Sequence, residues 1–315
     1  MPREVYLNGR FVHERDARLS IYDSGVLMGD MAFEVTRTIR GRAFRLREHL
    51  GRLWHSLSVM RIAPPLTIDE LERATLDTLE RNLLTESADD DWNIIHNVSR
   101  GPSSAFADAF EPLELRPTVI VSCFPLAPKM AEFAPNYTTG LDAVIPPQLA
   151  IPSSIVDASL KTRSRWHYQN ANLQADAIHP RATAVLVDTD GHLTEGTSGN
   201  VFVVRDGALE TPVARNLLAG ITRTLVMELA SRLGIPNREV DITRADALAA
   251  DEMFMTSTSI GIAHVRSFEG RALGDGSLGP VTARLRAALH AELGLDLAAQ
   301  AEFYARRAAT RRERG

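Results

Sequence analysis

The chain has 315 residues, more than the roughly 100 to 200 of a typical single domain, so we expect two domains. Its formal net charge of −5 provides no electrostatic attraction to nucleic acid or to anionic membranes, and its single cysteine, Cys123, excludes an intramolecular disulfide. Without an apolar signal segment or a run of about 18 apolar residues, the sequence predicts a soluble, cytoplasmic protein.

The predicted elements of residues 1–125 mix strands and helices, which indicates a small α+β domain. Asn8-Gly9 between two apolar runs predicts a hairpin of residues 5–7 and 10–12, because both turn positions favour a positive φ. Further strands are predicted over 32–38, 43–46, 93–98 and 117–124, and helices over 48–60 and 67–84. The second helix opens with the capping box Thr67 to Glu70. Cys123 lies in an apolar run typical of a buried strand.

Residues 126–140 contain Pro128, Pro135, Asn136 and Gly140, a composition typical of an inter-domain loop. A larger domain is predicted over 141–295, with helices over 167–178, 222–233 and 280–293 and strands over 183–188, 200–204, 208–211, 239–242 and 252–257. The arginine-rich tail, residues 296–315, is interpreted as a solvated helix end.

Lysine is rare in this chain, because only Lys129 and Lys161 occur among 35 lysines and arginines. A primary amine forms Schiff bases with carbonyl compounds, and desolvation brings its pKa toward neutrality. Lys129 lies in the predicted loop and is interpreted as solvated. Lys161 is therefore a candidate catalytic residue.

Three segments of the larger domain have an unusual composition, and two of them suit an anion. Residues 191–202 read GHLTEGTSGNVF, where small residues permit close backbone approach and Glu195 is the only carboxylate. Gly220 and Thr222 stand at the start of a predicted helix, whose free N–H groups and positive dipole end favour phosphate. The hydroxyl residues 256–259 end a predicted strand and offer further donors. Each of the last two segments alone is commonplace.

Together, the order and spacing of Lys161, Glu195 and the segments 218–223 and 256–259 resemble the class IV pyridoxal-phosphate aminotransferases, which have fold type IV. The segment 29–37, GDMAFEVTR, is similar to that family's Gly-Asp-x-x-Phe-Glu-x-x-Arg strand, and residues 49–53 resemble its helix with a phosphate-binding arginine. The resemblance covers roughly residues 5–290. It implies a homodimeric α+β protein whose larger domain has a β-barrel-like core, with the cofactor enclosed between the two domains.

The resemblance also implies a role for each of these residues. Lys161 would hold pyridoxal 5′-phosphate as a Schiff base and carry a proton between substrate Cα and cofactor C4′. Glu195 would favour the protonated pyridine nitrogen. Tyr168 would hydrogen-bond the phenolic oxygen, although it follows Lys161 by seven positions where branched-chain enzymes have five, and core packing is the alternative. The remaining expected cofactor contacts are Arg52, Ile221, Thr222 and Thr258 at the phosphate and Leu218 on the ring. No metal is expected.

The substrate is less well defined by the sequence. L-branched-chain enzymes have a carboxylate-binding arginine where this chain has Ile95, and the Arg-x-His pair of D-alanine enzymes is replaced by residues 102–107, PSSAFA. The turn Arg100-Gly101 is similar to that of some (R)-amine transaminases. A different carboxylate clamp is therefore expected, with Arg165 ranked first. The other candidate substrate contacts are Phe33, Arg37, His96, Arg100, Arg163 and Ser259.

These observations predict a branched-chain-aminotransferase-like transaminase that moves an amino group between an amino acid or amine and a 2-oxo acid. A D-amino acid or (R)-amine transaminase is the alternative, and an aminodeoxychorismate lyase-like enzyme of the same fold is a further one. A non-catalytic pyridoxal phosphate carrier is disfavoured, because a carrier needs no counterpart of Glu195.

Overall fold

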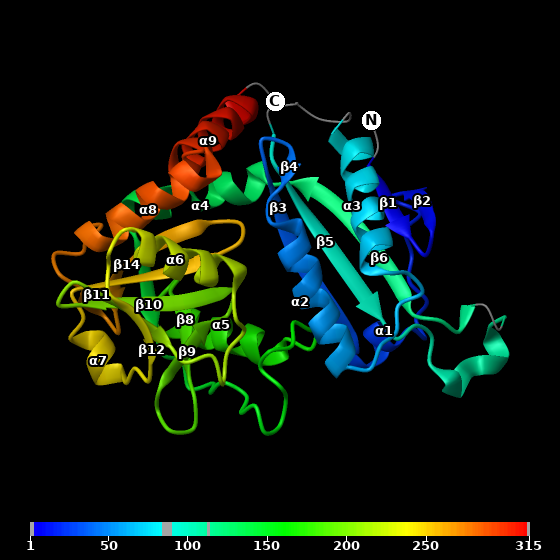
Figure 1. Ribbon diagram of the computed structural model, residues 1–315, viewed down its shortest axis with the longest axis horizontal. Helices are drawn as coiled ribbons and strands as arrows, with labels where there is room; N and C mark the ends of the chain where they lie inside the picture. The colour runs from blue at the N-terminus through cyan, green and yellow to red at the C-terminus, as the bar shows by residue number, and fades with distance from the viewer. Residues whose placement is uncertain (1–2, 84–89, 112–113, 314–315) are drawn as a thin grey trace. The chain divides into compact units, whose positions relative to one another are not determined.

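The computed structural model describes residues 3–83, 90–111 and 114–313. The chain divides into two compact units (Figure 1): Met1–Ala127 with Leu160–Arg165, and Pro128–Ser159 with Trp166–Gly315. The segment that carries Lys161 thus groups with the first unit, whereas the sequence-based boundaries assign it to the second domain. Leu84, expected to end the second helix, and Arg314 of the tail lie outside the described residues.

The first unit contains an antiparallel sheet with the strand order β2-β1-β6-β5-β3-β4. Its strands are β1 (Glu4–Leu7), β2 (Arg10–His13), β3 (Met31–Ile39), β4 (Arg42–Ala43), β5 (Trp92–Ser99) and β6 (Thr118–Pro125). Its helices are α1 (Ser24–Met28), α2 (Leu46–Val59), α3 (Ile68–Leu83) and the 3-10 helix η1 (Ser104–Ala109).

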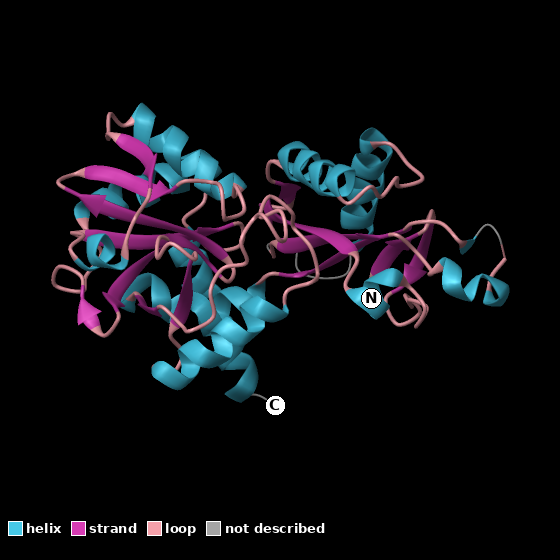
Figure 2. Cartoon of the chain, turned by 90° about the horizontal axis from the view of Figure 1, so that it is seen from below, coloured by secondary structure: helices cyan, strands magenta, loops and turns pink. Residues whose placement is uncertain are grey.

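Leucines of α2 and α3 form the core of this unit against the sheet. Leu50, Leu53 and Leu71 pack with Trp92 and Ile94 of β5. Figure 2 shows the two long helices on one side of the strands. Burial of these side chains contributes about 2 kcal/mol each, which explains why the amphipathic pattern predicted both helices.

Two local predictions in this unit are confirmed in detail. Asn8 and Gly9 have φ values of 50° and 89°, as the hairpin turn requires. The Thr67 hydroxyl accepts a hydrogen bond from the Glu70 N–H at 3.2 Å, and the Glu70 carboxylate accepts one from the Thr67 N–H at 2.7 Å. Cys123 is buried and unpaired, and burial raises its pKa to about 12, so its thiol is unreactive.

In the second unit, six strands form a closed ring in the order β10-β13-β14-β7-β8-β9, because β9 also pairs with β10. This confirms the expected β-barrel-like core. The ring consists of β7 (Leu141–Val144), β8 (Thr183–Val187), β9 (Leu193–Gly196), β10 (Gly199–Arg205), β13 (Glu252–Ser257) and β14 (Gly261–Phe268). Three further strands extend it: β11 (Ala208–Pro212), β12 (Asn237–Val240) and β15 (Arg271–Ala272).

The helices of the second unit are α4 (Ala127–Thr139), α5 (Trp166–Ile178), α6 (Ile221–Arg232), α7 (Arg244–Leu248), α8 (Pro280–Leu293) and α9 (Leu297–Glu313). The tail therefore continues as a helix, and Leu297, Ala301 and Tyr304 are buried. In the described part of the chain, no helix combines the length and the apolar character needed to cross a membrane.

Two sequence-based assignments are wrong. The loop expected over 126–140 is helix α4 over 127–139, because Met130, Ala134 and Tyr137 recur at helical spacing and are buried. Pro128 lies in the first turn, which needs no internal N–H donor, and Gly140 ends the helix with a φ of 76°. The strand expected over 43–46 ends at Ala43, and α2 already begins at Leu46.

Candidate active site

Backbone hydrogen bonds attach the Lys161 segment to β3 and α2. Thr162 forms an antiparallel bridge with Ala32, the Phe33 N–H donates to the Lys161 carbonyl at 2.9 Å, and the Arg163 N–H donates to the Met31 carbonyl at 2.9 Å. The Lys161 N–H donates to Ser56 Oγ at 3.2 Å. The segment thus adds to the part of β3 that β4 leaves uncovered, and this attachment fixes the base of the lysine side chain.

Three cations gather at the ring of Phe33. Lys161 Nζ lies 4.9 Å from the ring centroid, Arg163 Cζ 3.9 Å and Arg165 Cζ 5.6 Å, all within cation–π range. The Arg163 Nε–H donates to Asn97 Oδ1 at 2.8 Å. Lys161, Arg163, Arg165 and Phe33 were all singled out in the sequence, and the structure brings them together within the first unit.

Arg52 lies in a buried network with Glu34 and His49. It donates to both carboxylate oxygens of Glu34, at 2.8 and 2.7 Å, and His49 Nδ1 lies 3.1 Å from Glu34 Oε1. Burial alone would raise the pKa of Glu34, but the Arg52 charge and the hydrogen bonds from His49 and Arg52 hold it well below its usual range. Burial lowers the pKa of His49, so this imidazole is neutral near pH 7. The expected phosphate ligand Arg52 therefore already binds a carboxylate.

Three other candidate substrate residues have structural partners. Arg37 is 2 % exposed and pairs with Asp91 at 3.4 Å. Arg100 binds Asp30 at 2.7 Å and the carbonyls of Met60 and Arg61. His96 lies 2.9 Å from Thr75 Oγ1, and burial lowers its pKa to about 4. These contacts favour a role in the fold for each of the three; Ser259 is also buried.

In the second unit, Glu195 on β9 accepts hydrogen bonds from three neutral groups. The Tyr168 hydroxyl donates to Oε1 at 2.7 Å, and Asn200 Nδ2 and the Leu218 N–H donate to Oε2 at 3.3 Å each. Glu195 is 8 % exposed. Because a hydroxyl has a single proton, Tyr168 cannot donate to another acceptor while it donates to Glu195.

Close backbone approach explains the glycines near Glu195. A Cβ at Gly196 would lie 2.1 Å from Met255 Cε, one at Gly199 2.3 Å from the Thr256 carbonyl oxygen, and one at Gly220 2.1 Å from Asn200 Oδ1. Asn200 Nδ2 also donates to the Leu218 carbonyl at 2.8 Å, so it ties the segment before α6 to the carboxylate. The small residues singled out in the sequence are therefore required by strand and helix contacts around Glu195.

The start of α6 suits a phosphate group. Its N-cap, Gly220, supplies no side-chain hydrogen bond to the first-turn N–H groups, which include those of Ile221 and Thr222. At the end of β13, the buried hydroxyls of Thr256 and Ser257 have no hydrogen-bond partner among the described residues. In the strand register, Thr256 of β13 pairs with Asn200 of β10, and Asn200 pairs with Glu195 of β9. Thr258 lies two residues after Thr256 on the chain. A carboxylate, uncapped N–H groups and unpartnered hydroxyls fit a phosphorylated pyridine.

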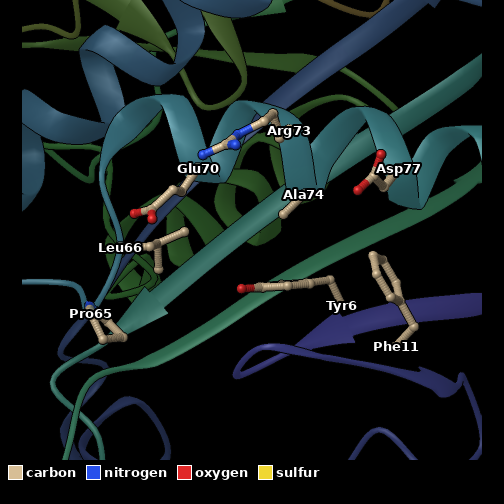
Figure 3. Close-up of a pocket in the computed structure, with 8 residues that line it drawn as sticks. All are labelled: Tyr6, Phe11, Pro65, Leu66, Glu70, Arg73, Ala74 and Asp77. Carbon is tan, nitrogen blue, oxygen red and sulfur yellow. The ribbon is translucent and has the colours of Figure 1, made fainter.

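A pocket of about 440 Å³ on the first unit contains none of the expected site residues. It lies between α3 and the β1–β2 hairpin (Figure 3) and is lined by Tyr6, Phe11, Pro65, Leu66, Glu70, Arg73, Ala74 and Asp77. Its lining contains no lysine, and therefore no amine that could form a Schiff base.

Sequence reasoning missed two groups that orient site residues. Asn200, the link between Glu195 and Leu218, stands in the segment 191–202, where a carboxamide five residues after the only carboxylate is a local signal. Ser56 and its hydrogen bond to the Lys161 N–H give no sequence signal, because 105 positions separate the two residues.

The chain is similar over most of its length to known proteins of one family. The sequence profile of the amino-transferase class IV family matches residues 31–268. A putative branched-chain-amino-acid aminotransferase of Methanocaldococcus jannaschii is 33% identical over 90% of this chain and 94% of its own length. A D-alanine aminotransferase of Listeria innocua is 31% identical over 90% of this chain and 93% of its own.

The solved branched-chain amino acid aminotransferase of Escherichia coli superimposes with a TM-score of 0.82 and 28% identity over 94% of this chain and 95% of its own. Fold type IV is thereby confirmed. Pyridoxal phosphate is confirmed as the cofactor, since the family depends on it and another similar branched-chain enzyme is solved in complex with N-(5′-phosphopyridoxyl)-L-glutamate. The substrates of this family are an amino donor and a 2-oxo acid. The chain therefore belongs to the class IV aminotransferases and is a pyridoxal-phosphate-dependent transaminase resembling the branched-chain enzymes.

Proposed function

We propose that this transaminase acts on aliphatic amino acids and 2-oxo acids, with Lys161 as its catalytic residue. The observation that carries this proposal is the attachment of Lys161. Main-chain hydrogen bonds on both sides of Lys161 hold it against β3, and its Nζ lies on the Phe33 ring, so the amine occupies a defined place. The other lysine, Lys129, is exposed on α4.

Bound pyridoxal phosphate supplies an electron-withdrawing ring that makes the Cα proton of the amino substrate acidic. Lys161 would hold the cofactor covalently, and its Nζ, once freed by a substrate amine, would carry the proton to and from Cα. The neutral form of Nζ is the one that accepts the Cα proton.

Glu195 is the partner we propose for the protonated pyridine nitrogen. Its three neutral donors fix its orientation but leave its negative charge uncancelled by those bonds, so a cationic ring nitrogen is favoured beside it. We assign Tyr168 to the orientation of Glu195. A bond from Tyr168 to the phenolic oxygen of the cofactor would require the present hydrogen bond to be exchanged.

The N–H groups of Ile221 and Thr222 and the hydroxyl of Thr258 are the proposed phosphate ligands, with Leu218 against the ring. The uncapped start of α6 supports this assignment, because its N–H groups and dipole favour a dianion. Arg52 would contribute its positive charge while it continues to bind Glu34.

A branched-chain preference is favoured by the relatives, which include enzymes with that name, and by the aliphatic pair Val35 and Ile95 on neighbouring strands β3 and β5. A D-amino acid preference is the second candidate, because a D-alanine aminotransferase is similar over the same share of the chain. We also propose a cytoplasmic homodimer. The unpaired buried thiol of Cys123 suits a reducing compartment, and equilibrium sedimentation tests the dimer.

The test is an absorption titration of the holoenzyme with D- and L-leucine, D- and L-alanine, and (R)- and (S)-1-phenylethylamine. Without any acceptor, a true donor converts the bound cofactor from its pyridoxal to its pyridoxamine form. We expect L-leucine to be effective. A response to D-alanine alone would replace the branched-chain assignment with the second candidate, and a cofactor that responds to none of these donors would contradict the proposal.

A further inference from the structure

We propose that Arg163, held against Phe33 by Asn97, binds the carboxylate of the substrate, so that this enzyme requires amino acids and 2-oxo acids rather than carboxylate-free amines. The proposal rests on the transaminase function and adds the group that recognises the substrate. Arg163 would take the role of the arginine that branched-chain enzymes have at the position of Ile95. The structure favours Arg163 over Arg165, which the sequence ranks first.

The geometry of Arg163 is defined at three points. Its N–H donates to the Met31 carbonyl at 2.9 Å, its Nε–H donates to Asn97 Oδ1 at 2.8 Å, and its Cζ lies 3.9 Å from the Phe33 centroid. Because Nε–H is engaged by Asn97, the two terminal amino groups are the remaining donors of this guanidinium. Within the described residues they form no hydrogen bond, and a carboxylate accepts two parallel bonds from such a guanidinium.

The charges around Arg163 favour an anion. Lys161 and Arg165 lie at the same ring, and Arg163 forms no ion pair within the described residues. Arg163 is an exposed residue, and partial desolvation together with the charge of Arg165 lowers its pKa, with no acidic group contributing to this change. The guanidinium still stays charged at neutral pH. Cations gathered at one ring repel one another, and a bound carboxylate relieves that repulsion.

The other arginines fit this role less well. Arg37 is buried on Asp91, and Arg100 is bound by Asp30 and two carbonyls. Arg165 Cζ lies farther from the Phe33 centroid than Arg163 Cζ does, at 5.6 Å against 3.9 Å. Arg163 therefore lies closest to the Phe33 ring among the three cations gathered there.

The strand register explains why Asn97 can hold Arg163 and which side chain the substrate would carry. Asn97 of β5 pairs directly with Phe33 of β3, so the two side chains share one sheet face. Two residues along each strand, Ile95 pairs with Val35 on the same face. A carboxylate clamp next to a half-buried aliphatic pair fits a monocarboxylic substrate with an aliphatic side chain.

Binding of an unreactive carboxylate tests the proposal without turnover. Calorimetry would measure the Kd of 4-methylvalerate, with 4-methylpentan-1-ol as the uncharged comparison, for the wild-type holoenzyme and for Arg163→Gln, Arg163→Lys and Arg81→Gln. Loss of a charge-assisted pair should raise the Kd of the carboxylate about 10- to 100-fold in Arg163→Gln and leave that of the alcohol unchanged. Arg163→Lys keeps the positive charge but cannot form two parallel hydrogen bonds to a carboxylate, so its loss of carboxylate affinity should be intermediate.

Arg81→Gln is the matched control, because Arg81 also lies over an aromatic ring, 4.0 Å from the Phe11 centroid, but pairs with Glu4 on the hairpin side of the unit. Its Kd should equal that of the wild type. As a positioning residue, Asn97 acts through Arg163, so Asn97→Ala should raise KM for L-leucine several-fold and leave kcat nearly unchanged.

A Kd for 4-methylvalerate in Arg163→Gln within twofold of the wild-type value would overturn the clamp. If the wild type transaminates L-leucine while Arg163→Gln binds normally, the clamp fails and the proposed function stands. If Arg163→Gln loses carboxylate affinity but the wild type transfers no amino group, the clamp stands and the proposed function fails.

Discussion

Two buried glutamates, one in each unit, have opposite surroundings. Glu34 on β3 is fully buried and binds Arg52 through both carboxylate oxygens, with His49 as a further partner. Glu195 on β9 is almost as buried, but it accepts hydrogen bonds from a hydroxyl, an amide and a backbone N–H.

This difference separates a carboxylate held in an ion pair from one that neutral donors orient. A buried ion pair with full hydrogen bonding cancels its own charge, whereas neutral donors orient a carboxylate and keep its charge effective. Glu34 therefore belongs to the support of α2 and β3, next to the Lys161 segment. Glu195 provides a fixed negative charge that suits a protonated pyridine.

The largest effect on activity should come from replacing Lys161, the proposed catalytic residue. Lys161→Ala should lower kcat/KM by about 10⁴-fold or more, because the covalent link and the proton carrier are lost together. Its melting temperature should stay near that of the wild type, since the hydrogen bonds of this segment come from the main chain. Lys129→Ala, which changes the exposed lysine of α4, is the control. Equal activity of the two variants would disprove the catalytic assignment.

Glu34→Gln should affect stability more than Glu195→Gln does. It leaves the nearly buried Arg52 without its counter-charge, so the free energy of unfolding should fall by about 3 to 5 kcal/mol in urea titrations at pH 7. Glu48→Gln, at the exposed partner of Arg45, should cost about 0.5 kcal/mol or less.

The pH dependence of the Glu34 contribution follows from the direction of its pKa shift. The folded-state pKa lies below the ordinary value of 4.5, so the unfolded chain takes up this proton first as the pH falls. The stabilisation by Glu34 is complete above about pH 4.5 and declines below it. The gap in unfolding free energy between wild type and Glu34→Gln should therefore narrow from pH 5 to pH 3, and a constant gap would contradict the pairing.

Glu195→Gln tests the second carboxylate, which neutral donors orient. The glutamine oxygen can keep the bonds from Asn200 and Leu218, and its amide can donate to the Tyr168 oxygen, so the fold should persist while the charge is lost. We expect kcat/KM to fall about 10²-fold, roughly 3 kcal/mol, with an unchanged melting temperature. Glu302→Gln on the exposed face of α9 is the control. A stability loss as large as that of Glu34→Gln would remove the distinction between the two carboxylates.

The sequence predicted the helices α2, α3, α5, α6 and α8 but not α4, because Leu50, Leu53 and Leu57 of α2, like the apolar positions of α8, repeat at helical spacing. Only three of the six barrel strands, β8, β10 and β13, were predicted. The short strands β7 and β9 hold four residues each, and β9 contains Glu195 in a run of small and polar residues without alternation. Strand pairing around a closed ring, rather than local propensity, makes those residues extended.

In the candidate site, too, local features could be predicted from the sequence, whereas long-range contacts could not. The types and order of Lys161, Glu195 and the start of α6 could be recognised locally. The long-range contacts of neighbouring site residues could not be recognised. Asn97 and Arg163 are 66 positions apart, and Arg52 and Glu34 are brought together by the packing of α2 on β3. The sequence therefore left several arginines as candidates for a clamp, and only their surroundings in the fold separate them.

Tyr168→Phe should have the smallest effect on activity. It tests whether the Tyr168 hydroxyl orients Glu195 or bonds the phenolic oxygen of the cofactor. If Tyr168 orients Glu195, loss of one hydrogen bond should cost about 1 kcal/mol, a fall of about fivefold in kcat/KM, and the double variant with Glu195→Gln should be no slower than Glu195→Gln alone. If Tyr168 instead bonds the phenolic oxygen of the cofactor, the two effects should multiply and the pH at which the cofactor absorption changes should shift. Tyr137→Phe, which removes a hydroxyl bond to the Ile260 carbonyl, should lower stability without either change. Because a hydroxyl donates only one proton, the two roles exclude each other in any single state of the enzyme, and the double variant identifies the one that governs the rate.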